Sequence, residues 1–288
     1  MKITRSGILV AVLLSTATLA CAESIPSAHV GDTFEITRVR DSSSQAGEAS
    51  SGSSHDKDTI VERIEALRPD GVELLVDLPQ GATANERRQA WQFPARVFKP
   101  TEGPRQLLNG PELEKRVDAW LRWGKMTREA CGHWFFTWNA FRIECEPQSV
   151  LQTIQAFDPA LPELRDGALY HDERALRPAR LTMNSSASDG STFSVLLMIN
   201  PEAVQRDRAE ADVVIGEISR KPLTLEAALA ERAKEAVSGT IEITIDADPA
   251  GNVRSLTKLT KLQTRKLDGS VETETVTETL QRRLLPHR

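Results

Sequence analysis

Aromatic residues and cysteines are scarce in this sequence of 288 residues: aromatic side chains make up 5% of it, with a single tyrosine, and only three cysteines occur. After residue 20 there is also no apolar run close to the ~20 residues that a membrane-spanning helix needs. The G-x-G-x-x-G, H-E-x-x-H and G-x-S-x-G patterns are missing. The absence of a long apolar run excludes a helical membrane bundle. The missing motifs mean that the chain lacks the common sequence signatures of dinucleotide-binding proteins and hydrolases. The remaining composition, 40% hydrophobic and 27% charged, is typical of a globular protein.

The charge balance narrows the range of partners. The formal net charge is −5, and removal of residues 1–22 leaves 34 basic and 41 acidic side chains, a net charge of −7. Such a surface repels nucleic acid and anionic membranes. Residues 55–58 and 171–173 combine histidine with acidic residues, but neither cluster has the ligand spacing of a closed zinc site. We therefore expect no nucleic-acid partner, no metal and no cofactor.

The first 22 residues have the pattern of a cleavable signal peptide. Lys2 and Arg5 precede an uncharged run over residues 7–20, which is too short to span a bilayer. A small-x-small cleavage pattern then ends at Ala22. We expect residues 23–288 to form the exported, periplasmic protein, without a transmembrane span. The alternative is a lipoprotein anchored through Cys21, although the residue three positions earlier is threonine rather than the leucine of a typical lipobox.

Two cysteines, Cys131 and Cys145, remain once the signal peptide is removed. In an oxidising compartment such a pair is expected to form a disulfide. The alternative is a thiol-dependent hydrolase, because Cys131 and His133 lie two residues apart and would share one face of a strand. No papain-like signature surrounds Cys131, so we assign no catalytic residue.

Alternating apolar and polar residues predict three strands near each end of the chain. These strands are expected over residues 30–40, 59–67, 72–78, 241–246, 253–267 and 271–285. Between the first two, residues 41–55 are rich in serine and glycine and poor in apolar side chains. Because such a segment cannot bury enough apolar surface to offset its ordering entropy, it is predicted to be a flexible loop.

Residues 105–237 are predicted to form a helical and aromatic middle section, with helices starting near Gly110, Pro147, Asn200 and Thr224. Each strand meander must bury one face. The sequence therefore predicts one α+β domain, in which a curved antiparallel sheet, built from N- and C-terminal three-strand meanders, is covered by the central helices. This layout resembles the open half-barrels of LolA-like lipoprotein carriers, in layout alone.

Seven of the aromatic residues are concentrated in residues 120–141. The apolar phase changes after Trp138, which predicts a hairpin centred near residues 138–139 with Cys131 opposite Cys145. The segment between these cysteines is similar to uncharacterised exported proteins of bacteria, a likeness that implies no activity. The aromatic residues either pack in the core or form a platform for an apolar or sugar ligand or a partner surface. The candidate binding residues are Trp120, Trp123, Trp134, Phe136 and Trp138.

These features favour a binding protein over an enzyme. We expect a periplasmic protein that binds an apolar small molecule between sheet and helices, or another envelope protein; a purely structural envelope component is a further alternative. At least one of Trp134, Phe136 and Trp138 is expected to be accessible to solvent. That side chain should line a groove beside the helix that carries Trp120 and Trp123.

Overall fold

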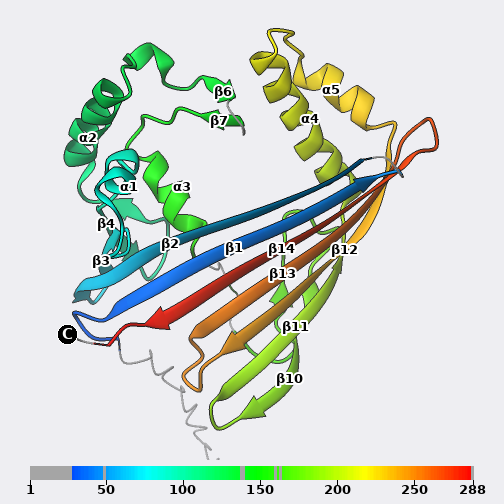
Figure 1. Cartoon of the computed structure of the whole chain (residues 1–288). Helices are drawn as coiled ribbons and strands as arrows, with labels where there is room; N and C mark the ends of the chain where they lie inside the picture. The colour runs from blue at the N-terminus through cyan, green and yellow to red at the C-terminus, as the bar shows by residue number, and fades with distance from the viewer. Residues whose placement is uncertain (1–27, 48–49, 137–139, 159–160, 162–163, 287–288) are drawn as a thin grey trace, which may run out of the picture.

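A ten-stranded antiparallel sheet forms the body of the protein (Figure 1). The computed structural model describes residues 28–47, 50–136, 140–158, 161 and 164–286. The terminal strands are β1 (Thr33–Ala46), β2 (Ser50–Arg68), β3 (Gly71–Asp77), β12 (Ala236–Ala247), β13 (Val253–Arg265) and β14 (Val271–Leu284). The last strand, β14, pairs with the first, β1, so both ends of the chain build one curved sheet. This confirms the predicted α+β layout.

The middle of the chain extends this sheet at both edges. Strands β4 (Ala95–Pro100) and β5 (Gln106–Leu107) follow β3 at one edge, and β11 (Gly190–Met198) and β10 (Thr182–Ala187) follow β12 at the other. Two separate hairpins also form. They are β6 (Trp134–Phe136) with β7 (Ala140–Arg142), and β8 (Leu169–Tyr170) with β9 (Ala179–Arg180). The middle section therefore contributes strands as well as helices.

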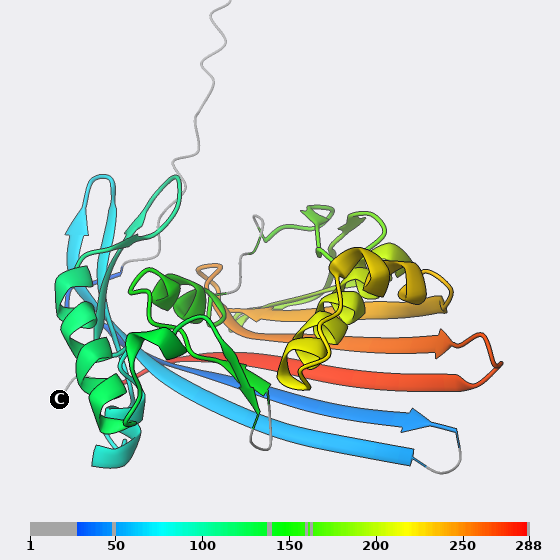
Figure 2. The same ribbon diagram turned by 90° about the horizontal axis from the view of Figure 1, so that it is seen from above.

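The helices lie on one face of the sheet in two groups. They are α1 (Ala84–Gln89), α2 (Gly110–Trp123), α3 (Ser149–Gln155), α4 (Pro201–Ile218) and α5 (Leu225–Arg232), with a short 3-10 turn at Arg128–Ala130. One group, α1 to α3 with hairpin β6–β7, stands over the β2–β4 end, and α4 with α5 stands over the other end (Figures 1 and 2). Among the described residues, no helix is long and apolar enough to cross a membrane.

Alternation along β12 sends its apolar side chains to one buried face. In β12, Ile241, Ile243 and Ile245 are fully buried, whereas Glu242 between them is exposed. One apolar cluster lies under α2 and α3. Another joins β11 and β12 to the segment around β8 and β9 and to Val204 of α4, and Leu256 of β13 packs against both clusters. The two clusters therefore stabilise one continuous sheet, since burial of each such side chain contributes about 1.5–3 kcal/mol.

The prediction of a flexible loop over residues 41–55 is wrong. Residues 41–46 belong to β1 and residues 50–55 to β2, and β1 is paired along its length with β2 on one side and β14 on the other. Across the first ladder the hydroxyls of Ser42 and Ser54 lie 2.8 Å apart, and Asp41 Oδ1 lies 2.6 Å from His55 Nδ1. The backbone ladder thus orders a segment whose side chains bury little apolar surface.

Tyr170, the single tyrosine, supplies a test of this packing. It is buried in the cluster that joins β11 and β12 to the segment around β8 and β9, and burial raises the pKa of its phenol from 10 to about 12, with a smaller effect from Asp172. The unfolded phenol ionises near pH 10, so unfolding becomes more favourable as pH rises from 10 to 12. We expect the ultraviolet absorbance of tyrosinate to appear near pH 12 in folded protein and near pH 10 in denaturant. Equal midpoints would contradict the burial.

Candidate functional site

The hairpin that carries the aromatic segment is locked by a disulfide. Trp134 pairs with Arg142 and Phe136 with Ala140, so the hairpin is centred on residue 138. This register places Cys131 opposite Cys145, and their sulfur atoms are bonded, with the two Cα atoms 5.6 Å apart. The predicted hairpin and disulfide are confirmed.

The same bond bears on the hydrolase alternative. The sulfur of Cys131, which that mechanism needs as a thiolate, is bonded to Cys145. His133 is exposed, and its Nδ1 lies 3.8 Å from Oε1 of Glu217 on α4. His133 therefore links the hairpin to the second helical group, and the disulfide-bonded chain holds no Cys131–His133 dyad.

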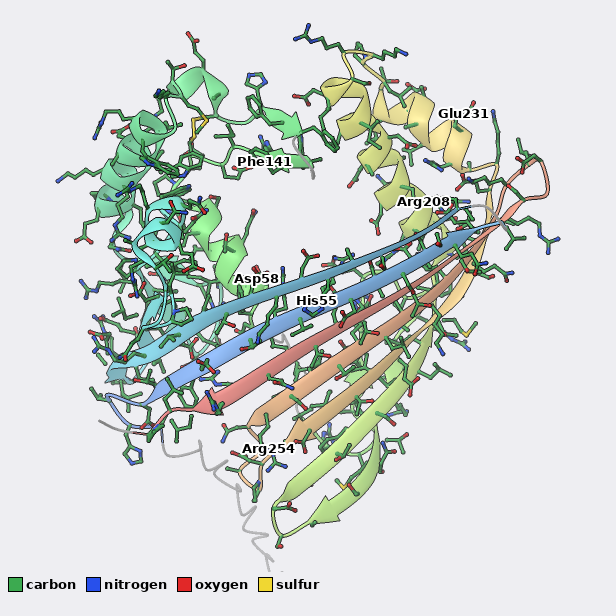
Figure 3. The ribbon with its side chains drawn as sticks, in the orientation of Figure 1. His55, Asp58, Phe141, Arg208, Glu231 and Arg254 are labelled. Carbon is green, nitrogen blue, oxygen red and sulfur yellow. A yellow bond between two sulfur atoms is a disulfide. The ribbon has the colours of Figure 1, made fainter. Side chains whose placement is uncertain are left out.

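A pocket of about 240 Å³ opens between α2, α3, the end of α1 and strand β7. Its apolar walls are Trp91, Trp120, Phe141 and Ile143. Its polar lining consists of Gln89, Gln92, Arg142, Glu144, Ser149, Gln152 and Thr153. Trp91 is only 3% exposed and belongs to the core, whereas Phe141 is 44% exposed on the hairpin above the sheet (Figure 3). The pocket thus has an apolar base and a mostly polar rim.

Local hydrogen bonds hold the α1 side of the pocket. Thr83 and Glu86 form a reciprocal capping box that starts α1, and the bond from the Thr83 backbone amide lowers the pKa of Glu86. Asn109, just before α2, accepts a hydrogen bond from the amide of Arg96 at 2.9 Å and donates one to the carbonyl of Pro94 at 3.2 Å. These contacts fix the turn that carries Trp91 and Gln92 against the start of α2.

The charged groups of the pocket neutralise each other. Arg142 donates from Nη1 to Oε1 of Glu144 at 2.8 Å and from Nε to the carbonyl of Gly132 at 2.8 Å. By contrast, no hydrogen bond within the described part of the chain engages the side-chain amides of Gln89, Gln92 or Gln152. The pocket therefore presents neutral donors and acceptors, and its one cation and one anion already pair.

The five candidate binding residues separate into distinct environments. Trp120 lines the pocket, and Trp123 is 44% exposed with the guanidinium of Arg88 5.8 Å from its ring. Trp134 and Phe136 lie on β6 outside the pocket lining, and Phe136 is 62% exposed. Trp138 lies outside the described residues. The structure thus brings only Trp120 of the described candidates to the pocket.

The other residues at this site were not among the candidates. Phe141 was counted in the aromatic segment, and its ring stacks on Phe135 across the hairpin at 6.2 Å between centroids. The sequence held a signal for this contact. In a hairpin centred on residue 138, Phe135 and Phe141 lie directly opposite each other, so their rings share one face. The three glutamine residues carry no sequence signal, since they come from separate segments. Among the described residues, no group of three or more His, Cys, Asp or Glu side chains is placed to hold a metal.

Comparisons with known proteins found weak structural similarity at low sequence identity. No protein-family model matches the chain, and no curated protein matches it. One similar solved structure is lipovitellin, described for its lipid–protein interactions, with 9% identity and a TM-score of 0.40; the match covers 90% of this chain and 26% of lipovitellin. Another is a conserved protein of unknown function with a hot dog fold from Alicyclobacillus acidocaldarius, with 9% identity, a TM-score of 0.11, and coverage of 92% and 84%. The class defined here is therefore architectural: an α+β protein with an open, curved antiparallel sheet.

Proposed function

We propose that this chain is an exported, non-catalytic binding protein that holds a ligand in the pocket between α2, α3 and β7. The observation that carries the proposal is the combination, around one concave site, of exposed aromatic surface on Phe141 with side-chain amides that no described residue engages in a hydrogen bond. A concave site with apolar walls and a few convergent polar groups is the usual form of a small-molecule site. The ligand has at least one apolar face, which rests against Trp120 and Phe141.

Export is part of the same proposal. The N-terminal pattern ending at Ala22 directs the chain to an oxidising compartment, and the Cys131–Cys145 disulfide is of the kind that persists there. The disulfide closes the base of the hairpin that carries Phe141. The oxidising compartment thereby maintains the disulfide that positions the hairpin and, with it, one wall of the pocket.

Native mass spectrometry of protein purified from a bacterial periplasm tests export and binding together. We expect a chain that begins after Ala22, carries one disulfide and retains a small-molecule adduct. Phe141→Ala should weaken the complex about tenfold, which corresponds to about 1.4 kcal/mol, because it removes an aromatic wall of the pocket. At ligand concentrations well below Kd, this change removes up to about 90% of the adduct. Phe136→Ala is the matched control: it removes the same ring from the same hairpin, outside the pocket lining.

The alternatives give different spectra. A diacylated Cys21 would replace export as a free chain by a lipid anchor. Loss of the adduct from Phe136→Ala but not from Phe141→Ala would move the binding surface to the other side of the hairpin. If no variant carries an adduct and the pocket keeps its structure in solution, the result favours a purely structural envelope component.

A further inference from the structure

We infer that the pocket accepts one neutral sugar ring at the end or side of a glycan, an inference that rests on the proposed binding function. A pyranose has a face of C–H groups and an edge of hydroxyl groups. The pocket offers both kinds of surface, because its lining combines the rings of Trp120 and Phe141 with the amides of Gln89, Gln92 and Gln152. The aromatic rings suit the C–H face of the sugar, and the amides suit its hydroxyl groups.

The polar lining disfavours a wholly apolar ligand. Seven of the eleven lining residues are polar, and burying an amide against a hydrocarbon without a hydrogen bond costs free energy. An amide offers both a carbonyl acceptor and N–H donors. A hydroxyl group also donates and accepts, so a polyhydroxylated ligand satisfies the amides in either orientation.

The charge arrangement disfavours an ionic ligand. Arg142 is engaged by Glu144 and by the carbonyl of Gly132, each at 2.8 Å. A phosphate or carboxylate ligand would have to compete with Glu144 for this guanidinium. It would also lie close to the carboxylate of Glu144, which would repel it. A neutral ligand leaves the pair intact.

The size of the pocket sets the length of the bound portion. Its volume of about 240 Å³ is just below the ~300 Å³ at the lower end of ordinary ligand sites. One ring with its substituents is therefore held between the aromatic walls, and the neighbouring rings of the glycan extend past the exposed rim at Gln89 and Gln152.

The test uses indole ¹H–¹⁵N NMR signals of the full mature chain during titration with neutral trisaccharides. The probes are maltotriose, cellotriose, triacetylchitotriose and mannotriose, with N-phenyl-1-naphthylamine as an apolar probe. At least one trisaccharide is expected to shift the Trp120 signal with saturation. Gln152→Ala should weaken that binding about tenfold, since it removes a hydrogen-bonding group from the rim. Gln155→Ala is the matched control, because Gln155 is exposed on the same helix outside the pocket.

The outcomes separate the two proposals. If the apolar probe shifts the Trp120 signal and no trisaccharide does, the sugar inference is overturned and the binding function stands. If no probe of either kind shifts it, both are overturned. Equal affinity of a trisaccharide for the Gln152→Ala and unmodified proteins would also overturn the sugar inference, because the amide rim is its basis.

Discussion

Replacing Trp91 with alanine is expected to lower the free energy of unfolding by about 3–5 kcal/mol, as is usual for a large aromatic side chain removed from a core. Trp91 is 3% exposed and belongs to the cluster under α2 and α3. It also forms part of the pocket base, so the cavity left behind would merge with the pocket. Equilibrium unfolding in urea, followed by circular dichroism, measures the effect.

Trp123→Ala is the control for this experiment. Trp123 is 44% exposed, and its ring contact with Arg88, at 5.8 Å, is at the surface. Its loss should cost less than about 1 kcal/mol. Similar losses of stability in the two variants would contradict the division between a buried base and an exposed helix surface.

Removing the disulfide is the second change with a large expected effect. In the Cys131→Ala/Cys145→Ala variant, the free energy of unfolding should fall by about 3 kcal/mol, within the ~2–5 kcal/mol usual for small secreted domains, because a loop of about 15 residues is no longer closed in the unfolded chain. The hairpin would also lose the bond at its base. Thermal melts of wild type and variant, each with and without reductant, measure this.

Reductant supplies the internal control. It should lower the melting temperature of wild type towards that of the variant and leave the variant unchanged. Alkylation of folded, unreduced wild type should label neither cysteine. Ready labelling of Cys131 under these conditions would contradict the structural disulfide and restore the hydrolase alternative with His133.

Alternation and register were sufficient to predict the main architecture. Isoleucines at every second position in β12 specify one buried face, and turns on both sides of β13 specify its antiparallel neighbours. The hairpin centre at residue 138 followed from a phase change in apolar residues, and with it the disulfide. These features are local, so the sequence around each of them carries the information.

The segment 41–55 shows where composition misleads. Its serine residues contribute little burial, and composition alone therefore indicates a loop. In the fold, β1 lies between β2 and β14, so residues 41–46 have ladder partners in β14 that are more than 200 positions away, and residues 50–55 pair with residues 41–46. The β1–β14 pairing joins the two ends of the chain in one sheet, and no local sequence pattern indicates it.

The site was less predictable than the fold, for a related reason. Aromatic residues mark the hairpin in the sequence, but which ring faces the pocket depends on how the hairpin sits over α2 and α3. Phe141 lines the pocket, whereas Trp134 and Phe136 do not. Gln89 and Gln152 line the same pocket because α1 and α3 lie at the same end of the sheet (Figure 1). Sequence identified the segment and left its orientation open.

Binding is proposed to occur in the pocket lined by Trp91 and Trp120. The most direct measurement is the indole NMR spectrum of ¹⁵N-tryptophan-labelled protein, assigned by single Trp→Phe variants, during a screen of small aromatic and saccharide fragments. We expect fragments that bind to shift the Trp91 and Trp120 signals and to leave the Trp123 signal unchanged, and we expect Phe141→Ala to abolish these shifts. Hits that perturb Trp123 or Trp134 while Trp91 and Trp120 stay fixed would contradict it.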